Sequence, residues 1–192
     1  NKVSVSLAAV LLACAGTAAH AEVKVLNEEQ QYGLSYLPFM VLQDQGLIEK
    51  EAQEMGLGDI EVRWSQFAGG NVMNDAILSG DLHFASGGVG PFVTLWSRTT
   101  NNVGVKAMSA MNAMPLYLNT RNPDVQTIED FTDKDRIALP AVRVSIQAIT
   151  LQMAAAQAFG EDQAERLNKL TVTQSHPDGM TALLKHERQA TQ

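Results

Sequence analysis

The chain has 192 residues and a formal net charge of −7, from 21 acidic and 14 basic side chains. It contains no basic run interleaved with aromatic residues, which argues against nucleic acid as a partner. The single cysteine, Cys14, lies near the N-terminus, so the rest of the chain has neither a disulfide nor thiol chemistry.

The first 21 residues have the pattern of a secretory signal peptide. Lys2 precedes an apolar stretch over residues 3–15, which is shorter than the roughly 20 residues that a membrane-spanning helix needs. Ala19-His20-Ala21 fits the small-x-small cleavage rule and predicts a mature chain that starts at Glu22. An alternative is lipid attachment at Cys14, because Leu11-Leu12-Ala13-Cys14 resembles a lipobox, although its second leucine is bulky for that motif.

Residues 23–108 predict strands that alternate with helices. The strands are expected at 23–26, 60–65, 82–86 and 103–108, with a polar loop over 27–36. Helices are expected from Pro38 to Gly46, over 49–55, over 71–78 and over 91–97. The first of them should turn Phe39, Val41 and Leu42 inward, and the third Val72, Ala76 and Ile77. This spacing indicates a parallel sheet built from βα units.

A second βα series is expected after a connecting strand at 116–118. Thr127-Ile128-Glu129-Asp130 is typical of a helix start, and a strand follows at 136–140. The next helix should run from Ser145 to Gly160, with Ile146, Ile149, Thr150 and Met153 at helical spacing. A strand at 170–173 and a last helix after His176 complete the series, and no strand is expected after Leu184. We therefore predict an α/β chain with a first lobe over 22–115, a crossover over 116–126 and a partial second lobe over 127–192.

Two clusters of small residues are the strongest candidates for a binding site. Gly69-Gly70-Asn71 and Ser86-Gly87-Gly88 each follow a predicted strand and precede a helix. Helix N-termini present unpaired N–H groups that bind anions, and in open α/β sheets ligands bind beyond the carboxyl ends of the strands. The alternative is ordinary turn and cap chemistry, which uses the same residue types. The negative net charge does not exclude an anion, because salt screens dispersed charges beyond about 8 Å.

Four other residues are candidate ligand contacts. Tyr36 could line the site with its ring and hydroxyl, or pack half-buried. Arg143 could clamp an oxyanion with its planar guanidinium, or remain solvated. Ser145 is a candidate contact, but a helix N-cap is the simpler interpretation. His176 could line the site, whereas the histidines show no metal-ligand spacing, so we expect no metal and no cofactor.

The order and spacing of several short motifs resemble the substrate-binding proteins of nitrate/sulfonate/taurine-type ABC importers. The motifs are Tyr36-Leu37-Pro38-Phe39, Gly46-Leu47-Ile48-Glu49, Ala76-Ile77-Leu78-Ser79-Gly80-Asp81-Leu82, Ser86-Gly87-Gly88 to Pro91, Ile128-Glu129-Asp130-Phe131, Arg136-Ile137-Ala138-Leu139-Pro140 and Ser175-His176-Pro177-Asp178-Gly179-Met180. The resemblance implies a type 2 periplasmic-binding fold, in which two lobes close on a small solute. It also implies a periplasmic location and delivery to a membrane permease.

The resemblance is incomplete at the end of the chain, where Lys185 onward does not continue the family's pattern. We expect a monomeric, non-enzymatic receptor for a sulfonate, taurine, nitrate or similar solute. The first alternative is a truncated fragment that does not bind, and the second is an enzyme on the same scaffold. The second lacks support, because the sequence shows no nucleophile elbow, phosphate loop or dinucleotide fingerprint.

Overall fold

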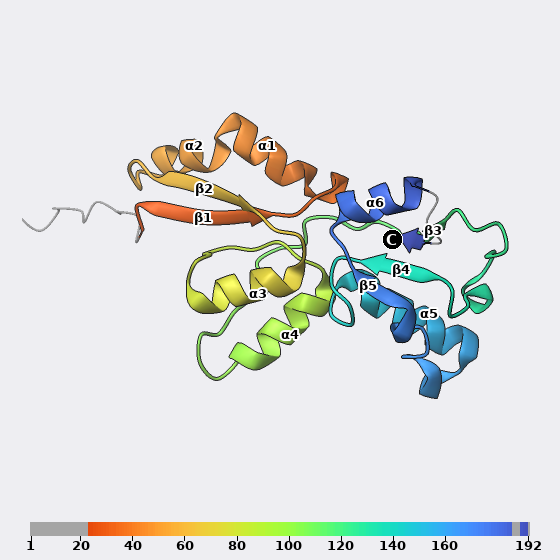
Figure 1. The fold of residues 1–192 in the computed structure, drawn as a ribbon. Coiled ribbons are helices and arrows are strands. Elements are labelled where there is room, and N and C mark those ends of the chain that lie inside the picture. Colours follow the sequence, from red (N-terminus) through yellow and green to blue (C-terminus); the bar gives the residue numbers. More distant parts are fainter. Residues whose placement is uncertain (1–22, 186–188, 192) are drawn as a thin grey trace, which may run out of the picture.

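The computed structural model describes residues 23–185 and 189–191, and the predicted signal peptide and Cys14 lie outside them (Figure 1). The first half contains β1 (Val25–Gln30), η1 (Leu34–Tyr36), α1 (Leu37–Gln45), α2 (Leu47–Glu54), β2 (Glu61–Gln66), α3 (Gly70–Ser79) and α4 (Val89–Thr99). The second contains β3 (Asn119–Thr120), η2 (Ile128–Asp130), β4 (Arg136–Leu139), α5 (Ile146–Phe159), η3 (Glu161–Gln163), η4 (Asn168–Leu170), β5 (Thr171–Thr173), α6 (His176–Leu184) and β6 (Gln189–Thr191). None of the helices in the described part of the chain is long and apolar enough to cross a membrane.

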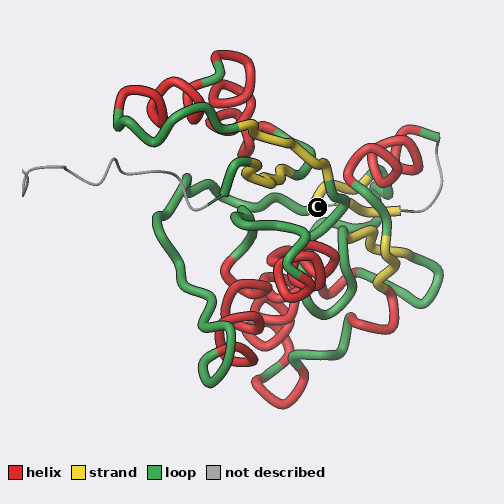
Figure 2. The backbone as a smooth tube through the Cα atoms, turned by 90° about the vertical axis from the view of Figure 1, so that its left-hand side faces the viewer, coloured by secondary structure: helices red, strands yellow, loops and turns green. Residues whose placement is uncertain are grey.

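The first half is built on the parallel pair β1–β2, whose register runs from Val25 opposite Glu61 to Gln30 opposite Gln66. Helices α1 and α2 lie on one side of this pair and α3 and α4 on the other, and Figure 2 shows the same arrangement from the side. Gly46 joins α1 to α2 at φ +57°, a left-handed conformation that favours glycine. Of the four strands predicted for this half, two are therefore present and pair in parallel, each followed by helices.

The strand β1 extends to Gln30, where a polar loop was predicted. Glu28 and Glu29 are 6% and 0% exposed. These two acidic residues therefore occupy buried strand positions that a hydrophobic pattern does not predict. The inward faces of two helices also differ from prediction. Val41 on α1 is 39% exposed, and on α3 Val72 is 43% exposed while Met73 is 2% exposed.

The prediction of a strand at 82–86 is wrong. Side chains make some of the hydrogen bonds to β1 that backbone groups would make in a regular strand. The His83 N–H donates to the Asn27 carbonyl at 3.0 Å, but the Asn27 N–H donates to His83 Nδ1 at 2.9 Å. The segment thus lies beside β1 without forming a regular ladder. The strand predicted at 103–108 is also absent, and Val103 and Met108 at its ends are 63% and 79% exposed.

The second half has a four-stranded sheet in the order β3-β6-β4-β5. β4 pairs in parallel with β5 and β6, and β3 pairs antiparallel with β6. The expectation of no strand after Leu184 is therefore wrong. The connecting strand β3 begins at Asn119 rather than at Leu116. The division into lobes and crossover stays a prediction.

The apolar core of the second half lies between β4 and α5. Its buried residues are Ile137, Leu139, Ala148, Leu151, Ala155, Leu167 and Leu170. On α5 the core face is Ala148, Leu151 and Ala155, whereas Met153, one of the residues noted at helical spacing, is 68% exposed. Burial of such side chains contributes about 1.5–3 kcal/mol each for the larger ones, so this core anchors the half.

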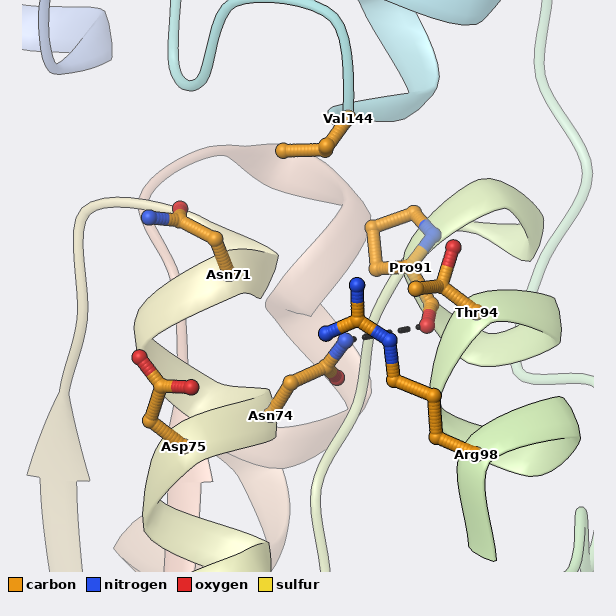
Figure 3. A pocket seen from close by; sticks show the side chains of 7 residues that line it. All are labelled: Asn71, Asn74, Asp75, Pro91, Thr94, Arg98 and Val144. Carbon is orange, nitrogen blue, oxygen red and sulfur yellow. Dashed lines mark hydrogen bonds between the residues drawn. The ribbon is translucent and has the colours of Figure 1, made fainter.

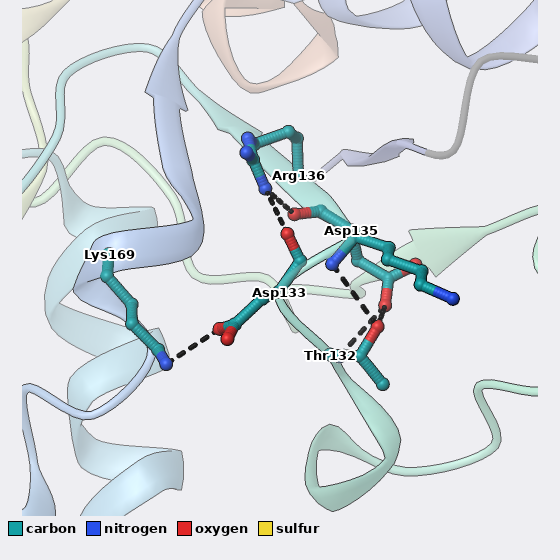
Figure 4. A network of polar contacts seen from close by, with 6 residues as sticks. Thr132, Asp133, Asp135, Arg136 and Lys169 are labelled. Carbon is teal, nitrogen blue, oxygen red and sulfur yellow. Dashed lines mark hydrogen bonds and ion pairs between the residues drawn. The ribbon is translucent and has the colours of Figure 1, made fainter.

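A polar network fixes the turn that leads into β4 (Figure 4). The buried Asp135 carboxylate accepts the Thr132 N–H at 2.9 Å and the Thr132 hydroxyl at 2.8 Å. The Arg136 guanidinium donates to the carbonyls of Asp133 at 2.9 Å and Asp135 at 2.6 Å. Lys169 pairs with Asp133 at 2.7 Å, but both side chains are exposed, so this pair adds little stability.

Candidate functional site

The N-termini of α3, α4 and α5 meet where the two halves of the structure touch. A Cβ built on Gly88, the N-cap of α4, would lie 2.5 Å from Ile146 Cβ at the start of α5. A Cβ on Gly90 would lie 3.0 Å from Ile149 Cγ1, and one on Gly69 would lie 3.3 Å from the Pro140 carbonyl oxygen. These glycines are therefore required by close approach between the halves. The structure brings the predicted glycine clusters next to the 140–146 segment.

The turn at Ser86 is held by buried side chains of the first half. The Ser86 N–H donates to Glu29 Oε1 at 2.6 Å. The Tyr36 hydroxyl and the Gln31 amide both donate to the Ser86 carbonyl, each at 3.4 Å, and Gln31 also contacts Met73 Sδ at 2.9 Å. The backbone of Ser86 is thus engaged within the protein. Its half-buried hydroxyl donates to Met111 Sδ at 3.7 Å, a weak bond that a ligand could replace.

The carboxyl group beneath this turn is in an unfavourable environment for a charge. Glu29 is 0% exposed, and its Oε2 atom has no hydrogen-bond partner among the described residues. Burial, opposed by the bond from Ser86, raises the pKa of Glu29 to about 8. Burial also raises the pKa of Glu28 to about 7, and burial followed by the charge of Glu29 raises the pKa of Tyr36. At neutral pH Glu29 is therefore mostly uncharged.

A small pocket opens beside the junction of the helices (Figure 3). Its volume is ≈ 110 Å³, and it is lined by Asn71, Asn74, Asp75, Pro91, Thr94, Arg98 and Val144. Asn71 is the predicted site residue that lines it. Arg98 reaches from α4 toward α3, and the sequence analysis missed it because the helix was expected to end at Ser97, whereas α4 continues to Thr99.

The other predicted residues have different environments. Gly70 is buried, and a Cβ there would lie 2.8 Å from Pro91 Cγ. Gly87 lies near Met73 with room for a Cβ at 3.5 Å. Arg143 is exposed and has φ +65°.

Ser145 caps α5, since its Oγ accepts the Ala148 N–H at 3.2 Å; the N-cap interpretation is thus confirmed. His176 is half-buried at the start of α6. Within residues 23–185 and 189–191, no group of three or more His, Cys, Asp or Glu side chains is arranged to hold a metal ion.

No family model and no curated protein matches the chain, but three chains of solved structures do, and two of them are described here. The periplasmic aliphatic sulphonate binding protein SsuA from Escherichia coli matches with a TM-score of 0.52 and 17% identity, over 88% of this chain and 53% of that one. The alkanesulfonate-binding protein SsuA from Xanthomonas axonopodis pv. citri, bound to MOPS, matches with a TM-score of 0.59 and 16% identity, over 89% of this chain and 54% of that one.

At these identities the likeness concerns the fold alone. The chain spans about half the length of both of these structures. The structural likeness to these two proteins confirms the predicted α/β fold of a periplasmic binding protein.

Proposed function

We propose that the protein is an extracytoplasmic solute-binding component of an ABC importer and that it binds a small anionic, sulfur- or nitrogen-containing solute between its two halves. The observation that carries this proposal is the convergence of the N-termini of α3, α4 and α5 on one junction. Each N-terminus presents about half a positive charge and unpaired N–H groups, which favour an anion at hydrogen-bond distance. The likeness to two sulfonate-binding proteins supports it at the level of the fold.

Capture requires the two halves to separate. Direct packing of Gly88 on Ile146 and of Gly90 on Ile149 leaves no room for a solute between them. Two halves of one chain that share a limited interface move relative to one another by default. We propose that the halves open about the predicted crossover, admit the solute against Asn71, the Ser86 hydroxyl, Gly87 and Arg143, and then close. Tyr36, Gly70, Ser145 and His176 remain candidates for shaping the same surface.

The cellular setting follows from the same proposal. Export by a signal peptide cleaved after Ala21 would deliver a monomer to the periplasm, where it would hand its solute to a membrane permease. The absence of paired acid–base groups in the predicted site favours binding without chemistry. A fragment that folds without binding is the competing proposal, since the chain spans about half of the proteins that it matches.

Calorimetry of the purified chain against ethanesulfonate, 2-aminoethanesulfonate, nitrate and bicarbonate tests the proposal. Binding at micromolar concentration without turnover is the expected result. A folded chain that binds none of these solutes would favour the fragment, and a product detected after incubation would favour an enzyme. The double variant Asn71→Ala, Ser86→Ala should weaken binding, whereas Asn119→Ala, on the exposed edge strand β3, should not.

A further inference from the structure

The pocket between α3 and α4 is lined by two oppositely charged side chains, those of Arg98 and Asp75. In the described part of the chain, neither the Arg98 side chain nor the Asp75 side chain forms a hydrogen bond or an ion pair, although both line the pocket. Two of the three remaining polar side chains on its walls, those of Asn74 and Thr94, are engaged internally. Asn74 donates to the Pro91 carbonyl at 3.0 Å, and the Thr94 hydroxyl donates to the Gly90 carbonyl at 3.1 Å.

We propose that this pocket binds a short zwitterion, with the acid group on the Arg98 guanidinium and the Asn71 amide and the ammonium group on Asp75. The inference rests on the proposed function, because Asn71, Pro91 and Val144 place the pocket at the junction where the solute would enter. A guanidinium fits a carboxylate or a sulfonate with paired N–H donors, and a carboxylate accepts the hydrogen bonds of an ammonium.

The size of the pocket limits the solute. A dry cavity of about 150 Å³ holds benzene, which has six heavy atoms. A pocket of ≈ 110 Å³ therefore takes a molecule of similar or smaller size. Glycine and 2-aminoethanesulfonate are compact enough for most of their atoms to lie inside, whereas a long alkyl chain would remain outside.

Charge balance distinguishes a zwitterion from a simple anion. An acid without an amine would meet Arg98 but would also be repelled by Asp75 on the neighbouring helix. An amine without an acid would bind Asp75 but would be repelled by Arg98. Both side chains are exposed, so each charge contact is screened and is worth about fivefold in affinity at most. A zwitterion gains both contacts and suffers neither repulsion.

Titration of the full chain by NMR with size-matched pairs of probes tests the inference. The pairs are glycine with acetate, and 2-aminoethanesulfonate with ethanesulfonate. We expect each zwitterion to bind about three- to fivefold more tightly than its partner and to shift the amide signals of Asn71 and Thr94. Asp75→Asn should remove this preference while leaving the anions bound at least as tightly. Arg98→Gln should weaken binding of all four probes.

The control variants are Asp44→Asn on α1 and Lys106→Gln in the loop after α4, which change an exposed charge away from the pocket residues. Both should bind like the parent chain. If the anions bind as tightly as the zwitterions, or if the shifts lie away from α3 and α4, the inference is wrong while the proposed function stands. If the folded chain binds none of the probes, both are wrong.

Discussion

Glu29 Oε1 accepts a hydrogen bond from the Ser86 backbone N–H at 2.6 Å. In a regular sheet, a backbone carbonyl oxygen of the neighbouring strand would accept this bond. On the same edge of β1, the His83 imidazole accepts the Asn27 N–H at 2.9 Å. The 82–86 segment is thus tied to β1 by side chains at two points. This explains why an extended segment beside the sheet is not a regular strand, and why Glu29 is buried.

Replacement of Glu29 by glutamine should make stability less dependent on pH. The folded-state pKa of Glu29, about 8, is above the ordinary glutamate value of 4.5, so the folded state binds more protons than the unfolded state between these pH values. The free energy of unfolding therefore falls as pH rises through this window. Glu29→Gln keeps an acceptor for the Ser86 N–H but carries no charge. We expect it to be more stable than the parent chain at pH 8.5, by up to about 5 kcal/mol, because the pKa of Glu29 is about 8 in the folded state and ordinarily 4.5, and each pKa unit corresponds to about 1.4 kcal/mol.

Urea denaturation at pH 5.5 and 8.5 measures this effect. Glu29→Ala is the matched control, because it also carries no charge but leaves the Ser86 N–H without an acceptor; it should be about 1–3 kcal/mol less stable than Glu29→Gln at both pH values. A parent chain that gains stability between these pH values would contradict the prediction. Glu28, whose pKa is about 7, should retain part of the pH dependence in the Glu29→Gln variant.

Substitution of Gly88 by alanine should disturb the junction between the halves. The added Cβ would lie 2.5 Å from Ile146 Cβ, a distance that neither the backbone of α4 nor that of α5 accommodates without a shift. We expect a loss of about 1–3 kcal/mol, typical of overpacking. The adjacent Gly87→Ala is the control, because its Cβ would meet only Met73 Cε at 3.5 Å. Thermal unfolding compares the two; equal losses would show that the junction is not tightly packed.

Replacement of Arg143 by glycine should stabilise the folded chain. Among the described residues, Arg143 is the non-glycine residue with a positive φ, at +65°. A left-handed conformation costs an ordinary residue about 1–2 kcal/mol, part of which is offset by the greater freedom of glycine in the unfolded chain. We expect Arg143→Gly to gain about 0.5 kcal/mol, and Arg143→Lys to be neutral. If Arg143 contacts the solute, the glycine variant should also bind more weakly, so denaturation and calorimetry should move in opposite directions.

Local signals predicted the second half better than the first. Helix α5 has Ser145 as its N-cap and Gly160 as its C-cap, as expected. The capping box of Thr127 and Asp130 is present at η2. These features depend on neighbouring residues, so sequence reveals them. The residues noted at helical spacing on α5 do not coincide with its core face, because the helix has two contacting faces. Ala148 and its neighbours face the core, whereas Ile146 and Ile149 contact the glycines of α4.

The binding role of the glycine clusters stays a prediction, and the structure shows Gly69 and Gly88 in close packing between the two halves. Glu29 and Arg98 were missed because their roles depend on contacts across the fold: the buried carboxyl meets Ser86, 57 residues away, and Arg98 meets the pocket only because α4 is longer than expected. The short β6 was missed because three residues show no hydrophobic alternation, and its position depends on pairing with β3 and β4.

Comparison of Ser145→Ala with Ser175→Ala should separate capping from solute binding. Each serine accepts a backbone N–H at the start of a helix, Ser145 at 3.2 Å from Ala148 and Ser175 at 3.3 Å from Asp178. Loss of either cap should therefore cost about 1 kcal/mol in denaturation experiments. Only Ser145 lies at the junction with α4, so only Ser145→Ala should weaken solute binding beyond the effect of lower stability. If both variants bind the solute equally well, Ser145 acts as a cap alone.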